Sequence, residues 1–530
     1  MAPLFDEIDL ESTLGQVVRP LGDLLSRRDD SVDVVKAKEA IWSRLTGSRS
    51  PLQPWRRACD LWCSQWFWPD SGTPGPPSAS ELRAAIDGVL RKDRTLDRGR
   101  IESRLAVSRE VAGRLAFFHW PLEFADVFYE PDGTLRARPG FDAVIGNPPW
   151  EMLRVDPGTA EEHSRACRNQ LVRFLRESSF YPNCDRGHVN LYQPFLERAL
   201  SLARPRGRVG LILPWGLATD DGAASLRRLL FDRMSVDALA GFENGAGLFP
   251  IHRGLRFLAL VADRTPPAGA SSRETRMRFG IRSAAEIEAL PDVDAPGDES
   301  AFPVRLTRET IARVGGAALR VPDLRSGGDL EWLLRIASAH PRLGSPEGWA
   351  VSFGRELNAT DHRDHFGGAP GLPVLEGKCI APFQAAEAGA TRFISRAAAE
   401  RLLPDRGFDR PRLAYRDVSG ATNQRTLIAA VLPAGVVTTH TLFCLRTPLP
   451  LVQQHFLCAL FNSDVLNRVV RLLMGSHVTT SLVEGLPVPR WSGTRLEVHI
   501  ARLAVRLSRR RTPAVDAALQ AAVARLYQML

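Results

Sequence analysis

The stretch FDAVIGNPPW (141–150) joins a short apolar run to a rigid polar turn. FDAVIG has the length and composition of a buried β-strand, and Asn147-Pro148-Pro149-Trp150 follows it directly. Ligands of open α/β sheets bind beyond the carboxyl ends of the strands, so the turn lies where an active site is expected. Two consecutive prolines fix the backbone and remove two N–H donors, which leaves carbonyl oxygens as acceptors.

The residue types of this turn suit chemistry on an exocyclic amine. An asparagine side-chain oxygen and a proline carbonyl together accept both hydrogens of such an amine. The lone pair of adenine N6 is delocalised into the ring, and two acceptors would draw the nitrogen toward a tetrahedral, more nucleophilic geometry. A neighbouring aromatic, here Trp150, can stack on a base that has left the duplex. The alternative is a Pro-Pro turn that only closes a strand.

The sequence around this turn alternates between strand-like and helix-like patterns. Apolar runs recur at 207–214, 236–244 and 255–263, and amphipathic helical patterns lie between them at 191–203 and 222–234. This alternation predicts an α/β fold with a largely parallel sheet that helices cover on both faces.

The two ends of the chain do not show this alternation of strand-like and helix-like patterns. Residues 1–116 are predicted to be helical, and the helical spacing of Trp55, Trp62, Trp66 and Trp68 favours a packing surface over base stacking. Short β-like runs separated by Gly, Pro and Asn follow residue 346, and 455–474 is predicted to be one helix.

The positive charge is concentrated in the last third of the chain. Residues 351–530 carry 22 Lys and Arg against 13 Asp and Glu, an excess of +9 that equals the formal net charge of the whole chain. Lys378 is the only lysine among them. Because guanidinium groups suit phosphates and guanine edges, the pattern indicates a surface that faces nucleic acid. A merely basic solvated surface is the alternative.

The chain has seven cysteines without close CxxC pairs, so we expect free thiols and no metal site. No run of about 18 apolar residues predicts a membrane span. The acidic start MAPLFDEIDLEST is unlike a secretory signal. These features favour a reducing cytoplasm.

In its motif and its surroundings, the sequence resembles the N6-adenine DNA methyltransferases of type II restriction-modification and related phage-defence systems. FDAVIGNPPW resembles their catalytic motif, and HWPLEFADVF, NLYQPFLERAL, GRVGLILPWGLATDD and GFENGAGLFPIHR flank it in the family's order. LEGKCIAPF, Thr422–Thr426 and the stretch 461–491 resemble the target-recognition region. The resemblance covers most of residues 50–495.

The resemblance implies a site-specific adenine methyltransferase that uses S-adenosylmethionine and acts on double-stranded DNA. Asn147, Pro148 and Pro149 would form the catalytic turn, with Trp150 and Phe249 stacking on the flipped base. We expect six arginines of the recognition region to face DNA: Arg392, Arg396, Arg410, Arg412, Arg416 and Arg425.

The implied fold is a partial Rossmann-like methyltransferase sheet between an N-terminal helical region and a C-terminal α+β target-recognition domain. The expected segments are 1–116 helical, 117–265 catalytic α/β, 266–345 linker and mixed, 346–492 target recognition, and 493–530 helical tail.

One expected feature of the family is missing. Residues 1–140, where its order would place the Gly-rich turn and acidic residue for S-adenosylmethionine, contain no Gly-x-Gly after a strand, and 265–530 offers none either. We therefore expect a partner polypeptide to carry the cofactor-binding half and complete the sheet. A truncated gene product is the other explanation.

Two rival functions remain open at this point. The first is a non-catalytic DNA-specificity subunit. The second is a Mg-dependent nuclease, in which Glu376, Lys378 and either Asp361 or Asp364 would serve the metal.

Overall fold

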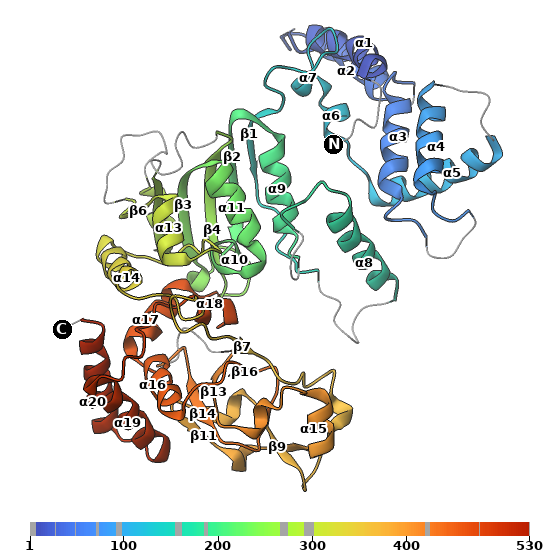
Figure 1. Ribbon diagram of the computed structural model, residues 1–530. Coiled ribbons are helices and arrows are strands. Elements are labelled where there is room, and N and C mark those ends of the chain that lie inside the picture. Colours follow the sequence, from blue (N-terminus) through green and yellow to red (C-terminus); the bar gives the residue numbers. More distant parts are fainter. Residues whose placement is uncertain are drawn as a thin grey trace. The chain divides into compact units, whose positions relative to one another are not determined.

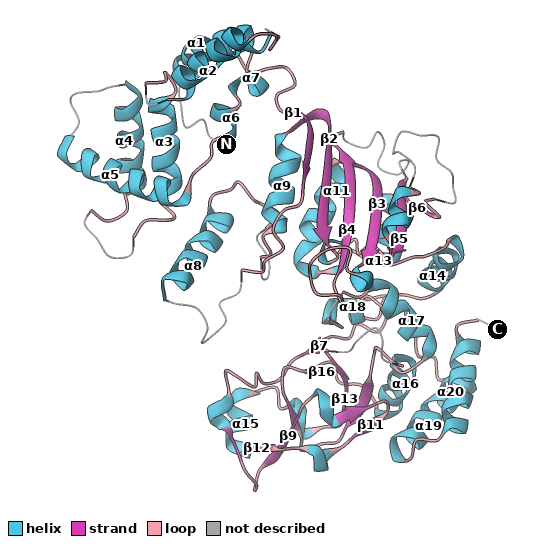
Figure 2. Cartoon of the chain, turned by 180° about the vertical axis from the view of Figure 1, so that it is seen from behind, coloured by secondary structure: helices cyan, strands magenta, loops and turns pink. Residues whose placement is uncertain are grey.

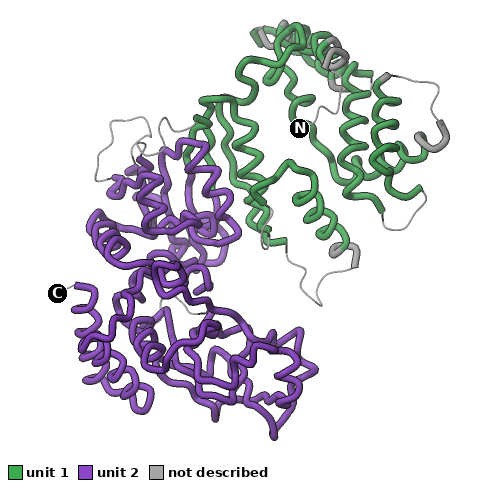
Figure 3. The backbone as a smooth tube through the Cα atoms, in the orientation of Figure 1, with its two compact units in different colours: residues 1–212, 261–266 green, residues 213–260, 267–530 purple. Residues whose placement is uncertain are grey.

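A computed structural model of the chain (Figure 1) describes residues 7–26, 28–47, 49–69, 74–91, 98–153, 162–184, 189–265, 274–290, 301–418, 424–475 and 477–528. The chain divides into two compact units, each described by itself below (Figure 3). Unit 1 is Met1–Ile212 with Val261–Pro266, and unit 2 is Leu213–Leu260 with Pro267–Leu530. Within the described residues, none of the helices has both the length and the apolar character of a membrane span.

The amino-terminal part of unit 1 is helical, as predicted. Its helices are α1 (Glu7–Ser26), α2 (Val32–Thr46), α3 (Gln53–Ser64), α4 (Ala79–Arg91), α5 (Arg98–Leu115), α6 (Trp120–Glu123), α7 (Ala125–Phe128) and, further along, α8 (Glu162–Glu177). Trp55, Trp66 and Trp68 are buried. Trp66 meets Trp62 and Phe174 edge to face, with ring centroids 4.5 and 5.4 Å apart. The tryptophan cluster is therefore a packing surface, and the prediction from helical spacing is confirmed.

Unit 1 also contains the strand that precedes the Pro-Pro turn. This strand, β1 (Phe141–Gly146), pairs in parallel with β2 (Ala203–Pro214), and Gly146 is the partner of Leu211. The helix α9 (Tyr192–Leu202) connects the two strands and contacts β1. The six-stranded sheet has the order β1-β2-β4-β3-β5-β6, so β1 is an edge strand with one neighbour among the described strands.

The other strands of this sheet are β3 (Ser235–Glu243), β4 (Arg256–Asp263), β5 (Thr275–Ile281) and β6 (Val304–Leu306). β3 and β5 are parallel, whereas β5 and β6 are antiparallel. β4 runs against β2, because Trp215 N just after β2 donates to Arg256 O at the start of β4 (3.1 Å), and Arg206 N near the start of β2 donates to Arg264 O after β4 (3.0 Å). The α/β class is confirmed, but the expectation of a largely parallel sheet is wrong, because β4 runs against β2 and β6 runs against β5.

Toward its carboxyl end, one face of β1 is bare in spite of its apolar sequence, whereas Phe141 at the start of the strand packs against Phe124 and Phe128. Ala143 and Ile145 point to the same face and are exposed, and Ile145 is 85% exposed. Figure 2 draws α9 beside β1, which it contacts. The prediction of helices on both faces therefore fails at β1. Burying an isoleucine contributes about 1.5–3 kcal/mol, which this strand forgoes.

Unit 2 begins with the helices that accompany β3–β6. They are α10 (Gly216–Thr219), η1 (Asp221–Ala223), α11 (Ala224–Arg233), η2 (Asn244–Ala246), α12 (Ala284–Glu288), α13 (Arg308–Gly315) and α14 (Gly327–Ala339). Leu226, Leu230 and Phe231 of α11 are buried, and the helix contacts β3.

The rest of unit 2 is α+β, as predicted. Its strands form three sheets, β14-β13-β16-β7, β15-β9-β12-β8 and β10-β11. The strand bounds are β7 (Phe353–Gly354), β8 (Phe366–Gly367), β9 (Leu372–Leu375), β10 (Ile380–Ala381), β11 (Gln384–Ala385), β12 (Arg392–Ile394), β13 (Arg412–Arg416), β14 (Ala429–Leu432), β15 (Val437–Thr438) and β16 (Leu442–Leu445). Short helical turns η3 (Arg363–His365), η4 (Gly377–Cys379), η5 (Glu387–Gly389) and η6 (Gly407–Asp409) connect them.

The helices of this part are α15 (Arg396–Leu402), α16 (Leu451–Phe461), α17 (Asp464–Leu473), α18 (Thr480–Glu484), α19 (Arg495–Arg509) and α20 (Pro513–Leu526). The single helix predicted over 455–474 is thus two helices. Ser463 ends the first and caps the second, because its side chain accepts from Leu466 N at 3.3 Å. The five predicted segment boundaries remain predictions.

The bare face of β1 leads to a stability prediction. We expect Ile145→Lys to change the free energy of unfolding of the isolated chain by no more than about 0.5 kcal/mol, because the side chain already meets water. Leu211→Ala, on the neighbouring strand at a 5% exposed position, should cost about 2–5 kcal/mol. Urea unfolding compares the two variants. An equal loss in both would mean that the isolated chain covers this face.

Candidate active site and DNA-facing surface

The Pro-Pro turn leaves the sheet at the carboxyl end of β1. Asn147 and Pro149 are exposed, Pro148 is buried and Trp150 is half-buried. Within the described part of the chain, no hydrogen bond engages the Asn147 side chain. The amide oxygen of Asn147 is therefore available to a ligand, and the two prolines hold the backbone beside it rigid.

The segment before α9 fixes the end of this turn. Trp150 Nε1 donates to Ile212 O (3.4 Å), and Asn190 Nδ2 donates to Trp150 O (3.0 Å). The backbone continues this pairing, since Leu191 N donates to Glu151 O and Leu153 N to Val189 O, both at 2.9 Å. Groups of unit 1 thus hold Trp150 both through its ring nitrogen and through its backbone carbonyl.

Sequence reasoning missed Asn190 as a positioning residue. Its Oδ1 also accepts from Tyr192 N (3.3 Å), so one side chain ties the turn to the first residues of α9. An asparagine directly before a predicted amphipathic helix is a recognisable capping signal. The bond to Trp150 O, however, joins residues 40 positions apart, which no sequence pattern indicated.

Phe249 lies in unit 2, on the loop between β3 and β4. It is half-buried and packs edge to face on Phe257, with ring centroids 4.8 Å apart. Because Phe249 and the Asn147–Trp150 turn belong to different units, its role as a second stacking residue stays a prediction.

Asn244 organises the loop that presents Phe249. It is 1% exposed, and its Oδ1 accepts from Phe249 N at 2.9 Å. Its Nδ2 donates to Phe249 O and Ile251 O, both at 3.1 Å. The buried side-chain amide of Asn244 therefore holds this loop closed. This is a second positioning role that the sequence did not reveal.

The carboxyl end of β2 carries an ionic arrangement in unit 2. The Arg256 guanidinium lies 4.1 Å from the centre of the Trp215 ring and 2.6 Å from Asp323. Arg325 bonds both Asp323 and Glu243, at 3.0 and 2.8 Å. Burial lowers the pKa of Arg256. The charged groups of these residues pair with one another. They therefore make this edge of the sheet rigid, and none of them is left to bind a ligand.

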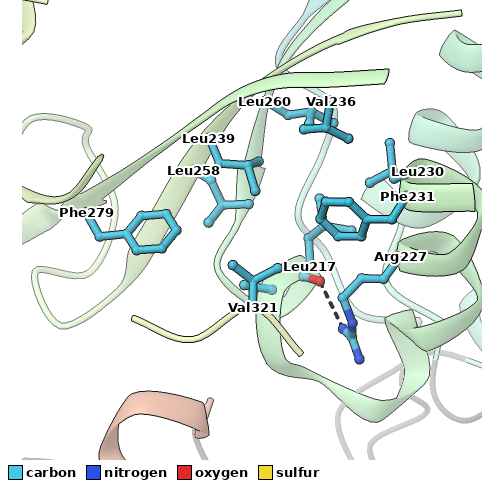
Figure 4. A pocket seen from close by; sticks show the side chains of 11 residues that line it. Leu217, Arg227, Leu230, Phe231, Val236, Leu239, Leu258, Leu260, Phe279 and Val321 are labelled. Atoms are coloured by element: carbon cyan, nitrogen blue, oxygen red, sulfur yellow. Dashed lines mark hydrogen bonds between the residues drawn. The ribbon is translucent and has the colours of Figure 1, made fainter. Parts of the chain in front are cut away.

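A small void lies beneath this edge, between α10, α11 and the strands (Figure 4). Leucine, valine and phenylalanine side chains line it, and Arg227 Nη1 donates to Leu217 O at 2.9 Å. Its volume of about 10 Å³ is room for one water molecule at most. It is a packing defect of the core rather than a cofactor pocket.

The described residues do not fit S-adenosylmethionine. β1 ends in the Pro-Pro turn, and β2 ends at Pro214, followed by Trp215. β3 is followed by the three-residue turn Asn244–Ala246, so the glycines of GAGLF open no α-helix. None of these turns supplies a Gly-rich cradle with a following helix and acidic residue.

Four of the six predicted DNA-facing arginines reach the surface of unit 2. Arg392 pairs with Glu376 (3.0 Å), and Arg396 pairs with Asp409 (2.6 Å). Arg410 Nη2 donates to Arg446 O (2.9 Å), and Arg416 bonds Ile380 O. Burial lowers the pKa of Arg416. Facing DNA stays a prediction for these four.

The other two arginines are internal. Arg412 forms a two-pronged pair with Glu356, both bonds 2.8 Å long, and the two side chains are 2% and 1% exposed. Arg425 bonds both carboxylate oxygens of Asp516, at 2.6 and 2.7 Å, and is 7% exposed. The side chains of Arg412 and Arg425 are both shielded from solvent. We therefore leave these two residues out of the proposed DNA-facing set. Their acidic partners lie 56 and 91 positions away, where charge counting could not find them.

An open hollow of about 300 Å³ adjoins Arg416. It is lined by Glu376, Gly377, Lys378, Arg416, Val418 and Thr441. Glu376 accepts from both Lys378 (2.9 Å) and Arg392 (3.0 Å). No group of three acidic, His or Cys residues able to hold a metal gathers within the described residues. The arrangement favours a cationic surface over the magnesium site that the nuclease hypothesis requires.

The buried pair leads to a prediction. Arg412→Ala should lower the free energy of unfolding by about 3–5 kcal/mol, because it leaves the Glu356 carboxylate buried and unpaired. Arg396→Ala, a matched loss of a half-exposed arginine, should cost less than about 1 kcal/mol. Urea unfolding measures both values. Full stability of Arg412→Ala together with weaker DNA binding would return Arg412 to the DNA-facing set.

Comparison with known proteins shows which family and which solved structures this chain is similar to. Residues 62–249 match the family described as Eco57I restriction-modification methylase, and no curated protein matches the chain. Among solved structures, the chain is similar to the Type IIL restriction-modification enzyme MmeI in complex with DNA, at 11% identity, over 100% of this chain and 74% of that one, with a TM-score of 0.45. The type IIG restriction endonuclease BpuSI gives 11% identity, 99% and 75% coverage and a TM-score of 0.28.

A third solved structure, the M protein of the Type I restriction enzyme EcoKI, gives 12% identity, 69% and 74% coverage and a TM-score of 0.19. All three likenesses are distant, so the description of the site rests on the residues above. The matched segment contains the Asn147–Trp150 turn and ends at Phe249. The similarity of this chain to the Eco57I restriction-modification methylase family therefore lies in residues 62–249.

Proposed function

We propose that this chain is the catalytic-loop and target-recognition portion of a site-specific DNA adenine-N6 methyltransferase, and that a separate polypeptide supplies the half that binds S-adenosylmethionine. The exposed acceptor turn at the carboxyl end of β1, inside the methylase-family segment, is the observation that carries the proposal. The cofactor supplies the methyl group, and the residues of this chain bind and orient the base that receives it.

Asn147 and Pro148 are assigned to the adenine amino group. The Asn147 side-chain oxygen and the Pro148 carbonyl accept its two hydrogens, which directs the nitrogen lone pair out of the ring plane. Trp150 stacks on the flipped base, and the bond from Asn190 to its carbonyl keeps its backbone in place. Because both amino hydrogens are accepted in this way, no general base is needed before methyl transfer, and the nitrogen loses one proton to solvent after the new N–C bond has formed.

The bare edge and face of β1 are assigned to the cofactor-binding half. In a doubly wound sheet with the order 3-2-1-4-5-6, the two halves meet between strands 1 and 4, and the cofactor binds where the order reverses. β1 corresponds to strand 4 of such a sheet, with β2 as its single described neighbour. A strand from the partner would pair along β1, and a helix packed on that strand would cover Ile145. The exposed position of Ile145 supports this assignment.

DNA binding is assigned to the recognition part of unit 2. Arg392, Arg396, Arg410 and Arg416 come from different strands and turns of that part and retain exposed or half-exposed guanidinium groups. The Arg416 hollow with Lys378 offers donors to phosphate or base edges. A specificity subunit without catalysis would need these residues as well, so methyl transfer is the activity that separates the two functions.

The first experiment measures transfer of labelled methyl from S-adenosylmethionine to unmethylated DNA by the chain together with the polypeptides of its own defence locus. We expect Asn147→Ala to lower incorporation by a factor of at least about 100. The substitution removes the side-chain oxygen that accepts a hydrogen bond from the adenine amino group before and during methyl transfer. Glu151→Gln changes an exposed side chain of the same loop and should leave the rate unaltered. Equal rates in the two variants would contradict the catalytic assignment and favour a specificity subunit.

A second experiment tests the partner surface through assembly. Ile145→Lys should prevent a stable complex with the cofactor-binding polypeptide, since a lysine there would be buried against an apolar helix. The matched variant Leu135→Lys changes another exposed leucine (60%) of unit 1 and should assemble normally. Analytical size exclusion reports the complex. Assembly that survives Ile145→Lys would place the partner elsewhere.

A further inference from the structure

The exposed face of α19 carries a row of cations. Arg495, Arg502, Arg506 and Arg509 are separated by seven, four and three residues, with His499 in the remaining gap, so they share one side of the helix. All five side chains are exposed, and Arg510 follows them directly. We call Arg495, Arg502, Arg506, Arg509 and Arg510 the α19 stripe.

The α19 stripe places five arginines without a described acidic partner on one short surface of unit 2. No ion pair with any described residue engages its five guanidinium groups, whereas Arg392, Arg396 and Arg425 are each paired with a carboxylate. The single acidic residue of α19 is Glu497, which is 4% exposed and caps the helix by accepting from Thr494 N at 2.9 Å. Among the described residues, α19 therefore presents a row of cations that no acidic side chain of the chain neutralises.

The opposite face of α19 is anchored in the core. Ile500, Leu503 and Leu507 are buried, and the helix contacts α16 and α20, which lies alongside it in Figure 1. Like charges four residues apart destabilise a helix by about 0.2–0.5 kcal/mol for each pair. Core packing does not require the exposed face of α19 to be basic. The fold nevertheless tolerates the repulsion between these arginines.

We propose that the α19 stripe binds the phosphate backbone of double-stranded DNA outside the recognition surface, without regard to sequence. From Arg495 to Arg509 the helix rises about 21 Å at 1.5 Å per residue. Duplex DNA presents one phosphate charge per about 1.7 Å of its axis, so a row of this length meets several phosphates. The inference rests on the proposed function only in requiring that the chain acts on DNA.

The helix also discriminates against other polyanions. An anionic membrane surface would need an apolar face to insert, and the apolar face of α19 is buried. Arginine in a regular row suits phosphate through paired N–H donors. An acidic protein surface is the remaining alternative, and the experiment separates it from DNA.

The test measures binding of a fluorescent random-sequence duplex of about 20 base pairs to the full chain between roughly 50 and 200 mM salt. Arg502→Ala/Arg506→Ala should reduce the slope of log affinity against log salt by about 1.8, since each lost phosphate contact removes about 0.9. The matched variant Arg233→Ala/Arg335→Ala removes two exposed helical arginines from α11 and α14 and should keep the wild-type slope. Thermal unfolding confirms that both variants are folded.

Each outcome decides something. A wild-type slope in Arg502→Ala/Arg506→Ala, while an Arg392→Ala/Arg416→Ala variant binds more weakly, would overturn the stripe and leave the proposed function intact. If Arg502→Ala/Arg506→Ala fails to assemble with the partner polypeptide but binds DNA like the wild type, the α19 stripe binds an acidic protein surface instead. Absence of DNA binding by the wild-type chain, alone and with its partner, would overturn the proposed function itself.

Discussion

β1 pairs with β2 along one edge and has no second neighbour among the described strands, and this one-sided pairing constrains the rest of unit 1. The strand is long enough and apolar enough to lie inside a sheet, yet Ile145 meets water. Parallel strands are normally buried on both faces, because the helices that connect them pack there. We propose that the partner polypeptide supplies a second neighbour and a covering layer for this strand. The one-sided pairing also places the Pro-Pro turn at the border of the described sheet, where a doubly wound fold binds its cofactor.

The turn itself is rigid without help from the missing half. Two prolines restrict its backbone, Pro148 is buried, and Asn190 binds the Trp150 carbonyl. Preorganised acceptors contribute to catalysis because they need no rearrangement when charge develops on the substrate. In unit 2, Asn244 closes the Phe249 loop by the same means, a buried side-chain amide bonded to backbone groups. Each aromatic residue assigned to the base is thus positioned by an asparagine.

The sequence predicted the α/β class, the strand that ends at Gly146 and the helical amino-terminal region, because hydrophobic periodicity is a local property. It did not predict the antiparallel β4 or the break at Ser463, since a short loop and a capping serine outweigh the apolar pattern there. The charge count located a basic third correctly, but could not separate paired from unpaired arginines. Arg412 is buried against Glu356, whereas Arg502 and Arg506 form no ion pair with any residue that the structure describes. Such pairings join residues far apart in the chain and depend on tertiary contacts that composition does not encode.

The most direct test of this account is the binding of S-adenosylmethionine to the purified chain, measured by isothermal titration calorimetry with and without the partner polypeptide. The account predicts no saturable binding to the chain alone, because none of its described strand ends forms a cofactor cradle, and saturable binding once the partner is present. Saturable binding to the chain alone at micromolar concentration would contradict it. That result would mean that these 530 residues contain a complete methyltransferase site.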